Sequence, residues 1–261
     1  MPKLIVMLRV KDGILFVREW LENLEKLADE IVAIDNGSTD GTYEALKAHP
    51  KVVDMIRTEG YNEGRDKNML YAMARKRKPD WLLWIDVDEI FEPEITRAHL
   101  NRLMRSKFVT KYKFRRFHFI DREHFAGSGL YYFYTSIHDR MMWKENPAGY
   151  FEDFILDSPN VKGIKGIELN THYRLKHLGY INKELVDKKV DIYKAVIDSK
   201  KEGSLNNMYL DNEVKIKWND KRNSKNVRLL NLRLDLKQFI SLFPRGIKKL
   251  SKMLNAMLKK R

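Results

Sequence analysis

The sequence predicts an α/β protein built on a mainly parallel sheet with helices on its faces. Short apolar runs at 4–8, 31–35 and 81–86 have the length and composition of buried strands. Segments in which apolar residues recur at helical spacing separate these runs. Strands that alternate with helices form βαβ units, whose right-handed crossovers produce parallel strands.

The elements follow one another in order along the chain. The first strand is followed by a helix whose apolar residues run from Ile14 to Leu27. The second strand ends at Asp35, and turn-forming residues and the start of a helix follow it at 36–42. This succession of strand, turn and helix is that of a βαβ unit.

The pattern continues with a strand at 52–57, a loop at 61–68, a helix at 69–74 and the strand at 81–86. Ligands of parallel sheets bind beyond the carboxyl ends of the strands. We therefore expect the polar residues that follow these strands to gather at one edge of the sheet. These residues are Arg9, Asp35, Arg65, Asp86 and Asp88.

The segment WLLWIDVDEIFEP at 81–93 carries the most specific chemical signal. Residues two apart on a strand share a face, so Asp86 and Asp88 are expected to point toward one ligand. Two carboxylates so placed suit a divalent cation, Mn²⁺ or Mg²⁺, that holds a nucleoside diphosphate. The alternative is a strand end followed by a solvated acidic turn.

Four motifs resemble those of family 2 glycosyltransferases, which have the GT-A fold. The motifs are VKDG at 10–13, IDNGSTDGT at 34–42, NEGRDKN at 62–68 and IDVDE at 85–89. They stand in the order of that family and cover roughly the first third of the chain, which makes them more specific together than any one alone. The resemblance implies a GT-A fold and an inverting transferase that uses a nucleotide sugar.

The resemblance also implies a role for each matched residue. Asp35 would read the nucleobase, and Arg65 and Lys67 would lie near the base or the diphosphate. Asp86 would meet the ribose or a metal-bound water, and Asp88 would ligate the metal. The further substrate-binding positions are Arg9, Val10 and Asn36.

Two of these residues have structural alternatives. Asp35 could cap its own turn rather than read a base. Arg65 could pair with a helix-face acid, either Glu63 or Asp66, rather than with a phosphate.

We expect an acceptor half at about 106–180 to follow a nucleotide half at about 1–105, and a helical extension to occupy 181–261. Within the acceptor half, KYKFRRFHF at 111–119 is typical of an antiparallel strand with one packed face. Its basic and aromatic residues could also bind a sugar, a phosphate or single-stranded nucleic acid.

An inverting enzyme needs a carboxylate that takes the proton of the acceptor hydroxyl. Asp139, Glu152 and Asp153 are the candidates in the segment 127–154. The family resemblance favours Asp153, because the base typically follows the D-x-D motif in a segment like GYFED. Glu152 is equally capable chemically, and the histidine of the W-x-G-x-x-H-E pattern of related members is missing here.

The segment 166–180 offers His172 and His177 between a short strand and the next helix. His172 resembles the histidine that some GT-A enzymes use as a further metal or diphosphate ligand. Arg174 and Lys176 could meet phosphate oxygens. The alternative is that both histidines are structural.

The chain carries 50 Lys and Arg against 36 Asp and Glu, a formal net charge of +14 at pH 7. Half of this excess lies in 245–261, which holds seven basic residues and no acid. The apolar residues of this tail fall on one helical face. Such a basic amphipathic helix binds an anionic membrane or packs on protein, and the periodicity favours neither.

The chain has no cysteine, which excludes disulfides, thiolate metal sites and thiol nucleophiles. No apolar run approaches the roughly 18 residues of a membrane span. We therefore expect a cytoplasmic protein, peripheral on the inner face of the membrane if the basic helix binds lipid.

The leading hypothesis is a metal-dependent inverting glycosyltransferase that takes a sugar from a UDP- or GDP-sugar donor. The acceptor would be a glycan or a lipid-linked molecule in the synthesis of surface glycans or polysaccharides. A sugar nucleotidyltransferase is the alternative enzyme, but it normally has a glycine-rich basic loop after the first strand, and RVKDG has one glycine. A basic nucleic-acid-binding protein is disfavoured because the clustered aspartates would repel phosphates, so no nucleic acid partner is expected.

Overall fold

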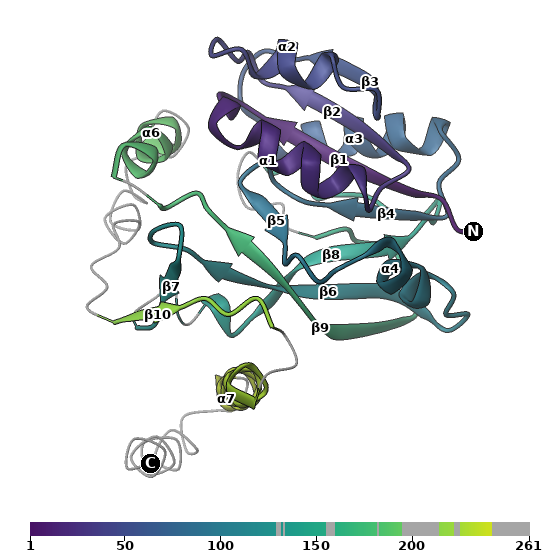
Figure 1. The fold of residues 1–261 in the computed structure, drawn as a ribbon. Helices are drawn as coiled ribbons and strands as arrows, with labels where there is room; N and C mark the ends of the chain where they lie inside the picture. Colours follow the sequence, from purple (N-terminus) through teal and green to yellow (C-terminus); the bar gives the residue numbers. More distant parts are fainter. Residues whose placement is uncertain are drawn as a thin grey trace.

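The computed structural model confirms the α/β class. It describes residues 1–128, 132, 134–154, 160–181, 183–194, 214–221 and 225–241. Eight strands form one sheet in the order β3-β2-β1-β4-β8-β6-β9-β5, and β7 and β10 form a separate pair (Figure 1). The pairings among β3, β2, β1 and β4 are parallel, whereas β8 is antiparallel to both of its neighbours.

The amino-terminal strands lie where the apolar runs predict them. In chain order the elements are β1 (Leu4–Val10), α1 (Ile14–Glu25), β2 (Glu30–Asp35), α2 (Thr42–Lys47) and β3 (Val52–Arg57). The parallel register aligns Val10 with Asp35 and Asp35 with Arg57. The last residues of three strands therefore form one row at the carboxyl edge of the sheet.

The predicted loop at 61–68 is wrong, because α3 (Glu63–Lys76) begins inside it. The side chain of Asn62 caps this helix by accepting a hydrogen bond from the backbone N–H of Arg65 at 2.9 Å. Glu63 and Asp66 in the first turn add favourable charge at the helix amino terminus. The motif residues are thus held on a rigid element.

The expected placement of the two aspartates on a strand is also wrong. β4 (Trp81–Trp84) ends two residues before Asp86, and Asp86 and Asp88 lie in a turn that the Glu89 N–H closes by donating to the Asp86 carbonyl at 3.0 Å. β4 pairs with β1 and β8, but β5 pairs with β9. The chain has to turn between the two strands, so alternation does not apply at 86–88.

Among the described residues, the second half contributes the other strands of the large sheet, the β7–β10 pair and three helices. These elements are β5 (Glu89–Phe91), α4 (Arg97–Met104), β6 (Val109–His118), β7 (His124–Ala126), β8 (His138–Lys144), β9 (Ile167–His177), α6 (Lys183–Lys194), β10 (Lys215–Lys217) and α7 (Lys225–Ser241). β6 is antiparallel to β8, as expected, and parallel to β9. Its Phe114 and Phe117 belong to the core, but its polar Arg115 and His118 are buried as well.

Two hydrophobic clusters cover the two faces of the sheet. α1 contributes Trp20 to one cluster, and α3 contributes Leu70 to the other, so these helices lie on opposite faces (Figure 1). Leu234 of α7 belongs to the same cluster as Trp20. The boundary at residue 180 stays a prediction, and the basic tail at 245–261 lies outside the described residues. None of the described helices is long and apolar enough to cross a membrane.

The segment with two candidate bases is bound to α3 by close backbone contacts. The Gly64 N–H donates to the Phe154 carbonyl at 2.9 Å, and Asn68 exchanges two hydrogen bonds of 2.8 Å with the backbone of Phe151. A Cβ on Gly64 would lie 2.2 Å from the carbonyl oxygen of Glu152. Only glycine allows this approach.

The substitution Gly64→Ala is expected to push the segment 152–154 off α3. Overpacking of this kind costs about 1–3 kcal/mol of unfolding free energy. Hydrogen exchange at the Phe151 amide should accelerate. Gly60→Ala is the control, because Gly60 has a positive φ but no atom within 4 Å of a new Cβ, so it adds backbone strain without a clash. Unchanged protection of Phe151 in Gly64→Ala would contradict this packing.

Candidate active site

Asp35 lies at the end of β2, fully buried at the carboxyl edge of the sheet. Its Oδ1 accepts hydrogen bonds from the backbone N–H groups of Gly37 at 3.1 Å and Ser38 at 2.9 Å, and from Arg57 Nε at 3.2 Å. Within the described part of the chain its Oδ2 has no hydrogen-bond partner. Asp35 therefore caps its turn and still presents one buried acceptor, which is costly unless a ligand donates to it.

Asn36 connects this turn to neighbouring elements. Its backbone N–H donates to the Val10 carbonyl at 2.8 Å, and its Nδ2 donates to Thr58 Oγ1 at 2.7 Å and to Asp66 Oδ2 at 2.8 Å. Val10 itself is buried. The side chain of Asn36 thus ties the turn to α3.

Arg9 approaches the same edge from β1 and stacks on Tyr61. Its guanidinium lies 4.1 Å from the centre of the Tyr61 ring and donates to the Tyr61 hydroxyl at 2.7 Å. Its Nε and Nη1 are buried and have no hydrogen-bond partner among the described residues. Burial lowers the pKa of Arg9, but Tyr61, Glu63 and Asp86 raise it above its ordinary value. The group stays charged and offers two donors to an anion.

The two basic residues of α3 that the motif assigns to the donor, Arg65 and Lys67, are already paired. Arg65 Nε donates to Asp66 Oδ1 at 2.8 Å, which is one of the structural alternatives. Lys67 is 1% exposed, pairs with Glu63 at 2.6 Å and lies 4.4 Å from the ring of Trp84. Burial lowers the pKa of Lys67. Arg65 is 40% exposed and can still meet a ligand, but Lys67 is enclosed.

Asp86 is held in place by Arg140 from β8. Arg140 Nη2 donates to Asp86 Oδ2 at 2.5 Å, and Trp84 Nε1 donates to Asp86 Oδ1 at 3.1 Å. Burial raises the pKa of Asp86, but Arg140, together with Lys67 and Arg116, brings it below its ordinary value. Asp86 is therefore ionised at neutral pH.

Arg140 and Arg116 also neutralise Glu89. Arg140 Nε lies 2.7 Å from both oxygens of Glu89, and Arg116 Nη1 donates to Oε1 at 3.0 Å. Arg116 pairs with Asp139 as well, by two hydrogen bonds. Burial raises the pKa of Asp139, but Arg116 and Arg140 lower it below its ordinary value. Asp139 is thus a salt-bridged carboxylate.

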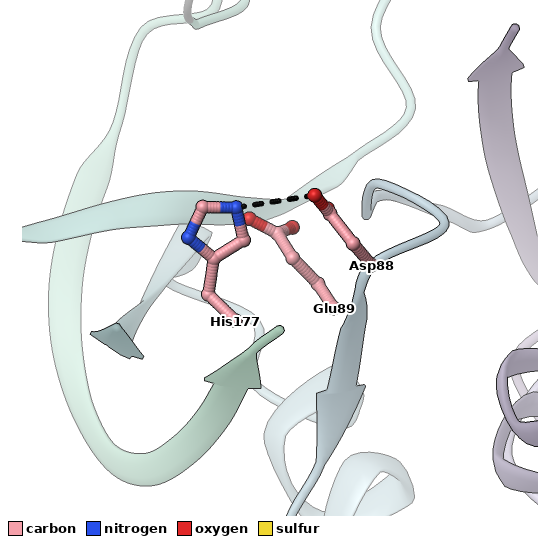
Figure 2. Close-up of side chains that lie close together, drawn as sticks. All are labelled: Asp88, Glu89 and His177. Carbon is pink, nitrogen blue, oxygen red and sulfur yellow. Dashed lines mark ion pairs between the residues drawn. The ribbon is translucent and has the colours of Figure 1, made fainter. Parts of the chain in front are cut away.

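Asp88, Glu89 and His177 form a buried cluster whose ligand atoms lie within 4.8 Å of one another. Figure 2 shows the three side chains converging, with His177 Nε2 at 3.4 Å from Asp88 Oδ2. Pairing of β5 with β9 places Glu89 opposite His177, and the Leu178 N–H donates to the Asp88 carbonyl at 2.7 Å. These three side chains could hold a metal ion.

The other predicted residues lie apart from this cluster. His172 is exposed on β9, five residues before His177, and is not a member of the cluster. Asp153 is exposed, and Glu152 lies 3.6 Å from Lys162 Nζ. Both acids stand beside the start of α3 through the contacts of Gly64.

Sequence reasoning assigned no role to Arg140, Arg116 or Glu89, and it favoured His172, which is not a member of the candidate cluster. In HDRMMWK at 138–144, three polar residues precede an apolar run, which indicates a strand whose first residues are charged or polar. Which acids they would meet depends on the pairing of β8 with β6 and β4, which the sequence does not reveal.

A cavity of about 330 Å³ opens beside Asp88. Lys11 and Phe16 line it from the amino-terminal half, and Gly179 and Leu185 line it from the segment after β9. A larger cavity of about 740 Å³ lies between β10 and α7 and includes none of the cluster residues. The smaller cavity adjoins the acidic turn, because Asp88 lines it.

Comparison with known proteins identifies the family. Residues 11–157, more than half of the chain, match the family described as Glycosyl transferase family 2. The chain belongs to glycosyltransferase family 2. The motifs around Asp35 and Asp88 lie inside the matched region.

Two curated relatives match part of the chain, and one solved structure matches its fold. An uncharacterized protein of Mycobacterium bovis and one of Mycobacterium tuberculosis are each 35% identical over 91 residues, which cover 31% of this chain and 22% of the relative. The match thus spans about a fifth of these relatives. A mannosyltransferase from Pyrobaculum calidifontis, solved in complex with GDP-Man and Mn²⁺, has a TM-score of 0.50 at 12% identity and covers 100% of this chain and 81% of its own. This family 2 chain therefore shares the GT-A fold.

The lowered pKa values of Asp86 and Asp139 predict the acid stability of this family 2 chain. Because the folded pKa lies below the unfolded value of about 4, the contribution is complete above that pH and is lost as the pH falls through the folded pKa. Urea unfolding should give a free energy that is steady from pH 7 to about 5 and falls below about 4. Asp139→Asn should lower the free energy at pH 7 and flatten the fall, and an unchanged slope in this variant would contradict the account.

Proposed function

We propose that the chain transfers a sugar from a nucleoside diphosphate sugar to an acceptor hydroxyl, with inversion and with a divalent cation. Two observations carry the proposal: the buried pair of Asp88 and His177, and the guanidinium of Arg9, which interacts with Asp86 and whose Nε and Nη1 have no partner among the described residues. A carboxylate, an imidazole and an unsatisfied guanidinium at one edge suit a cation and a diphosphate. The family match supports this class of reaction.

The charge around the turn fits a divalent cation. Four carboxylates lie close together there: Asp86, Asp88, Glu89 and Asp139. Arg116 and Arg140 pair with Asp86, Glu89 and Asp139, so the acids outnumber the arginines that pair with them. Such an excess in a buried site is costly unless a cation offsets it.

Asp88 and His177 would hold the cation. Glu89 would offer a further carboxylate oxygen to it while it remains paired with Arg116 and Arg140. This assignment puts His177 in the place that the motif resemblance gave to His172. Mn²⁺ suits a mixed carboxylate and imidazole set better than Mg²⁺, which prefers oxygen ligands. The bound cation would offset the charge that gathers on the departing diphosphate.

The donor would bind along the row at the ends of β1 to β3. Asp35 Oδ2, which has no hydrogen-bond partner among the described residues, can accept a hydrogen bond from a ring N–H of the nucleobase. Uracil and guanine both offer such an N–H, so a UDP- or GDP-sugar is the donor that we propose. The GDP-Man complex of the Pyrobaculum mannosyltransferase, which has the same fold, supports this choice of donor class.

The remaining donor contacts follow from the geometry. Arg9 would bind the diphosphate, and the partly exposed Arg65 would approach the base or the phosphates. Lys67 would act indirectly, because it is buried and its charge acts on Asp86. Asn36 would fix the turn that carries Asp35, partly through its backbone hydrogen bond to the Val10 carbonyl.

Asp153 is the base that we propose, with Glu152 as the alternative. The acceptor hydroxyl would lose its proton to this carboxylate while its oxygen bonds to the anomeric carbon and the bond to the nucleoside diphosphate breaks. Asp139 is unsuited to this role, because its pKa is lowered by Arg116 and a base works best with a pKa near the operating pH.

The acceptor would be a glycan or a lipid-linked molecule in the synthesis of surface glycans or polysaccharides. The cavity of about 330 Å³ beside Asp88 is large enough for a sugar ring and adjoins the charged turn. The basic tail at 245–261, outside the described residues, would hold the protein at an anionic membrane if it binds lipid.

A thermal-shift panel of nucleoside diphosphates with and without Mn²⁺ tests this proposal. UDP or GDP with Mn²⁺ should raise the Tm, and at 100 times Kd the stabilisation is about 2.7 kcal/mol. Asp88→Asn should abolish the metal-dependent part because it removes a charged ligand. His172→Asn is the control and should leave the shift unchanged. A shift that survives Asp88→Asn, or that is lost in His172→Asn, would contradict the assignment.

The base is tested by Asp153→Asn against Glu152→Gln. Once a donor sugar and an acceptor are known, Asp153→Asn should lower kcat by about 10²–10⁴ while the nucleotide-dependent thermal shift stays intact. Glu152→Gln should change kcat little. The opposite ranking would transfer the role to Glu152, and equal activity of both variants would place the base elsewhere.

A further inference from the structure

His118, to which neither the motifs nor the family match assigns a role, lies against His177. The two Nδ1 atoms are 2.8 Å apart, and the rings meet edge to face with centroids separated by 4.8 Å. His177 Nε2 lies at 3.4 Å from Asp88. In Figure 2 the second ring nitrogen of His177 points away from Asp88. His177 therefore stands between a carboxylate and a second imidazole.

Strand register creates this arrangement. β6 and β9 are parallel, and their pairing aligns His118 with His177. β5 and β9 are antiparallel, and their pairing aligns Glu89 with His177. The Phe119 N–H donates to the His177 carbonyl at 2.9 Å and extends the ladder beyond this point. Three adjacent strands thus fix these residues in one row.

Burial shields the hydrogen bond between His118 and His177 from water. His118 is 3% exposed and His177 is 4% exposed. The ring of Tyr180 packs against both, with centroids 6.0 Å from His118 and 5.1 Å from His177. A hydrogen bond in such a shielded place is stronger than one in water, so it fixes the orientation of the rings.

The chemistry of imidazole sets the direction of this hydrogen bond when a cation is present. A neutral imidazole has one N–H and one bare nitrogen. If His177 Nε2 offers its lone pair to a cation, the proton of His177 must be on Nδ1. His177 Nδ1 then donates, and His118 Nδ1 must accept.

We infer that His118 is a positioning residue for the cation site. Its Nδ1 accepts the hydrogen bond from His177 Nδ1 and holds His177 in the tautomer and ring orientation that present Nε2 to the cation beside Asp88. Partners of this kind orient metal-bound histidines and raise their basicity. The inference rests on the proposed function, because it requires a cation between Asp88 and His177.

The test measures Mn²⁺ binding directly, by the electron paramagnetic resonance signal of unbound Mn²⁺ in a titration of the full chain with UDP or GDP present. His118→Phe keeps a planar ring but removes the acceptor. His118→Asn keeps an acceptor, because its Oδ1 occupies the position nearest to Nδ1. His118→Phe should weaken Mn²⁺ binding by about 10–100-fold, and His118→Asn should stay within a few-fold of the native chain.

Folding is monitored by circular dichroism and by Tm. If His118→Phe does not fold, His118→Gln replaces it, because its accepting oxygen lies one bond farther out and should also weaken binding. Near-native Mn²⁺ binding by His118→Asn would show that the hydrogen-bond acceptor matters. If His118 had only a packing role, Mn²⁺ binding would depend on the volume of the side chain and not on its acceptor.

The outcomes distinguish this inference from the proposed function. If the native chain and all variants bind Mn²⁺ equally tightly, the cation site stands and the role of His118 is overturned. If His118→Asn folds and binds as weakly as His118→Phe, the accepting role is overturned as well. If the native chain binds no Mn²⁺ with either nucleotide, the proposed cation site is itself overturned and the inference fails with it.

Discussion

The guanidinium of Arg140 is the interaction on which the rest of the candidate site depends. It contacts Asp86 at 2.5 Å and Glu89 at 2.7 Å, and so bridges the two ends of the turn between β4 and β5. Carboxylates this close would repel one another in a buried place. Arg140 pairs with both acids of the turn, and Arg116 pairs with Glu89 and with Asp139.

The acids around the turn outnumber the arginines that pair with them, and this excess of acids connects the structure to the proposed function. Two arginines pair with three of the four acids around the turn, and the fourth, Asp88, faces His177. A folded protein tolerates buried acids in excess of their basic partners where a ligand offsets them. On the neighbouring strand β1, Arg9 presents two donors without partners among the described residues. A cation and a diphosphate together would satisfy both.

The sequence predicts the parallel half of the fold because each of its strands is a short apolar run with a turn after it. β3 at Val52–Arg57 has the predicted bounds. The motifs also lead to Asp35 and to the acidic turn, since both follow such runs. Sequence reasoning failed at Asp86, where Ile85 prolongs the apolar run although the strand ends at Trp84. Ile85 is buried but is not part of a strand, so a buried apolar residue at this position does not extend β4.

The rest of the site could not be read from the sequence because it depends on pairing between distant strands. His172 and His177 stand on the same strand, and only the register of β9 with β5 and β6 places His177 beside Asp88. The start of α3 was missed for another reason. The residues after Asn62 are polar, and the first turn of the helix depends on its cap and on the pair of Glu63 and Lys67, whereas the apolar residues begin only at Met69.

The central claim is that Asp88 and His177 hold a divalent cation that binds the diphosphate of the donor. The most direct measurement is a crystal structure of the full chain with Mn²⁺ and UDP or GDP, with anomalous diffraction recorded at the manganese edge. The account predicts one anomalous peak within bonding distance of Asp88 Oδ2 and His177 Nε2, with the diphosphate between this peak and Arg9. A peak at His172, or a bound diphosphate with no metal near Asp88, would contradict it.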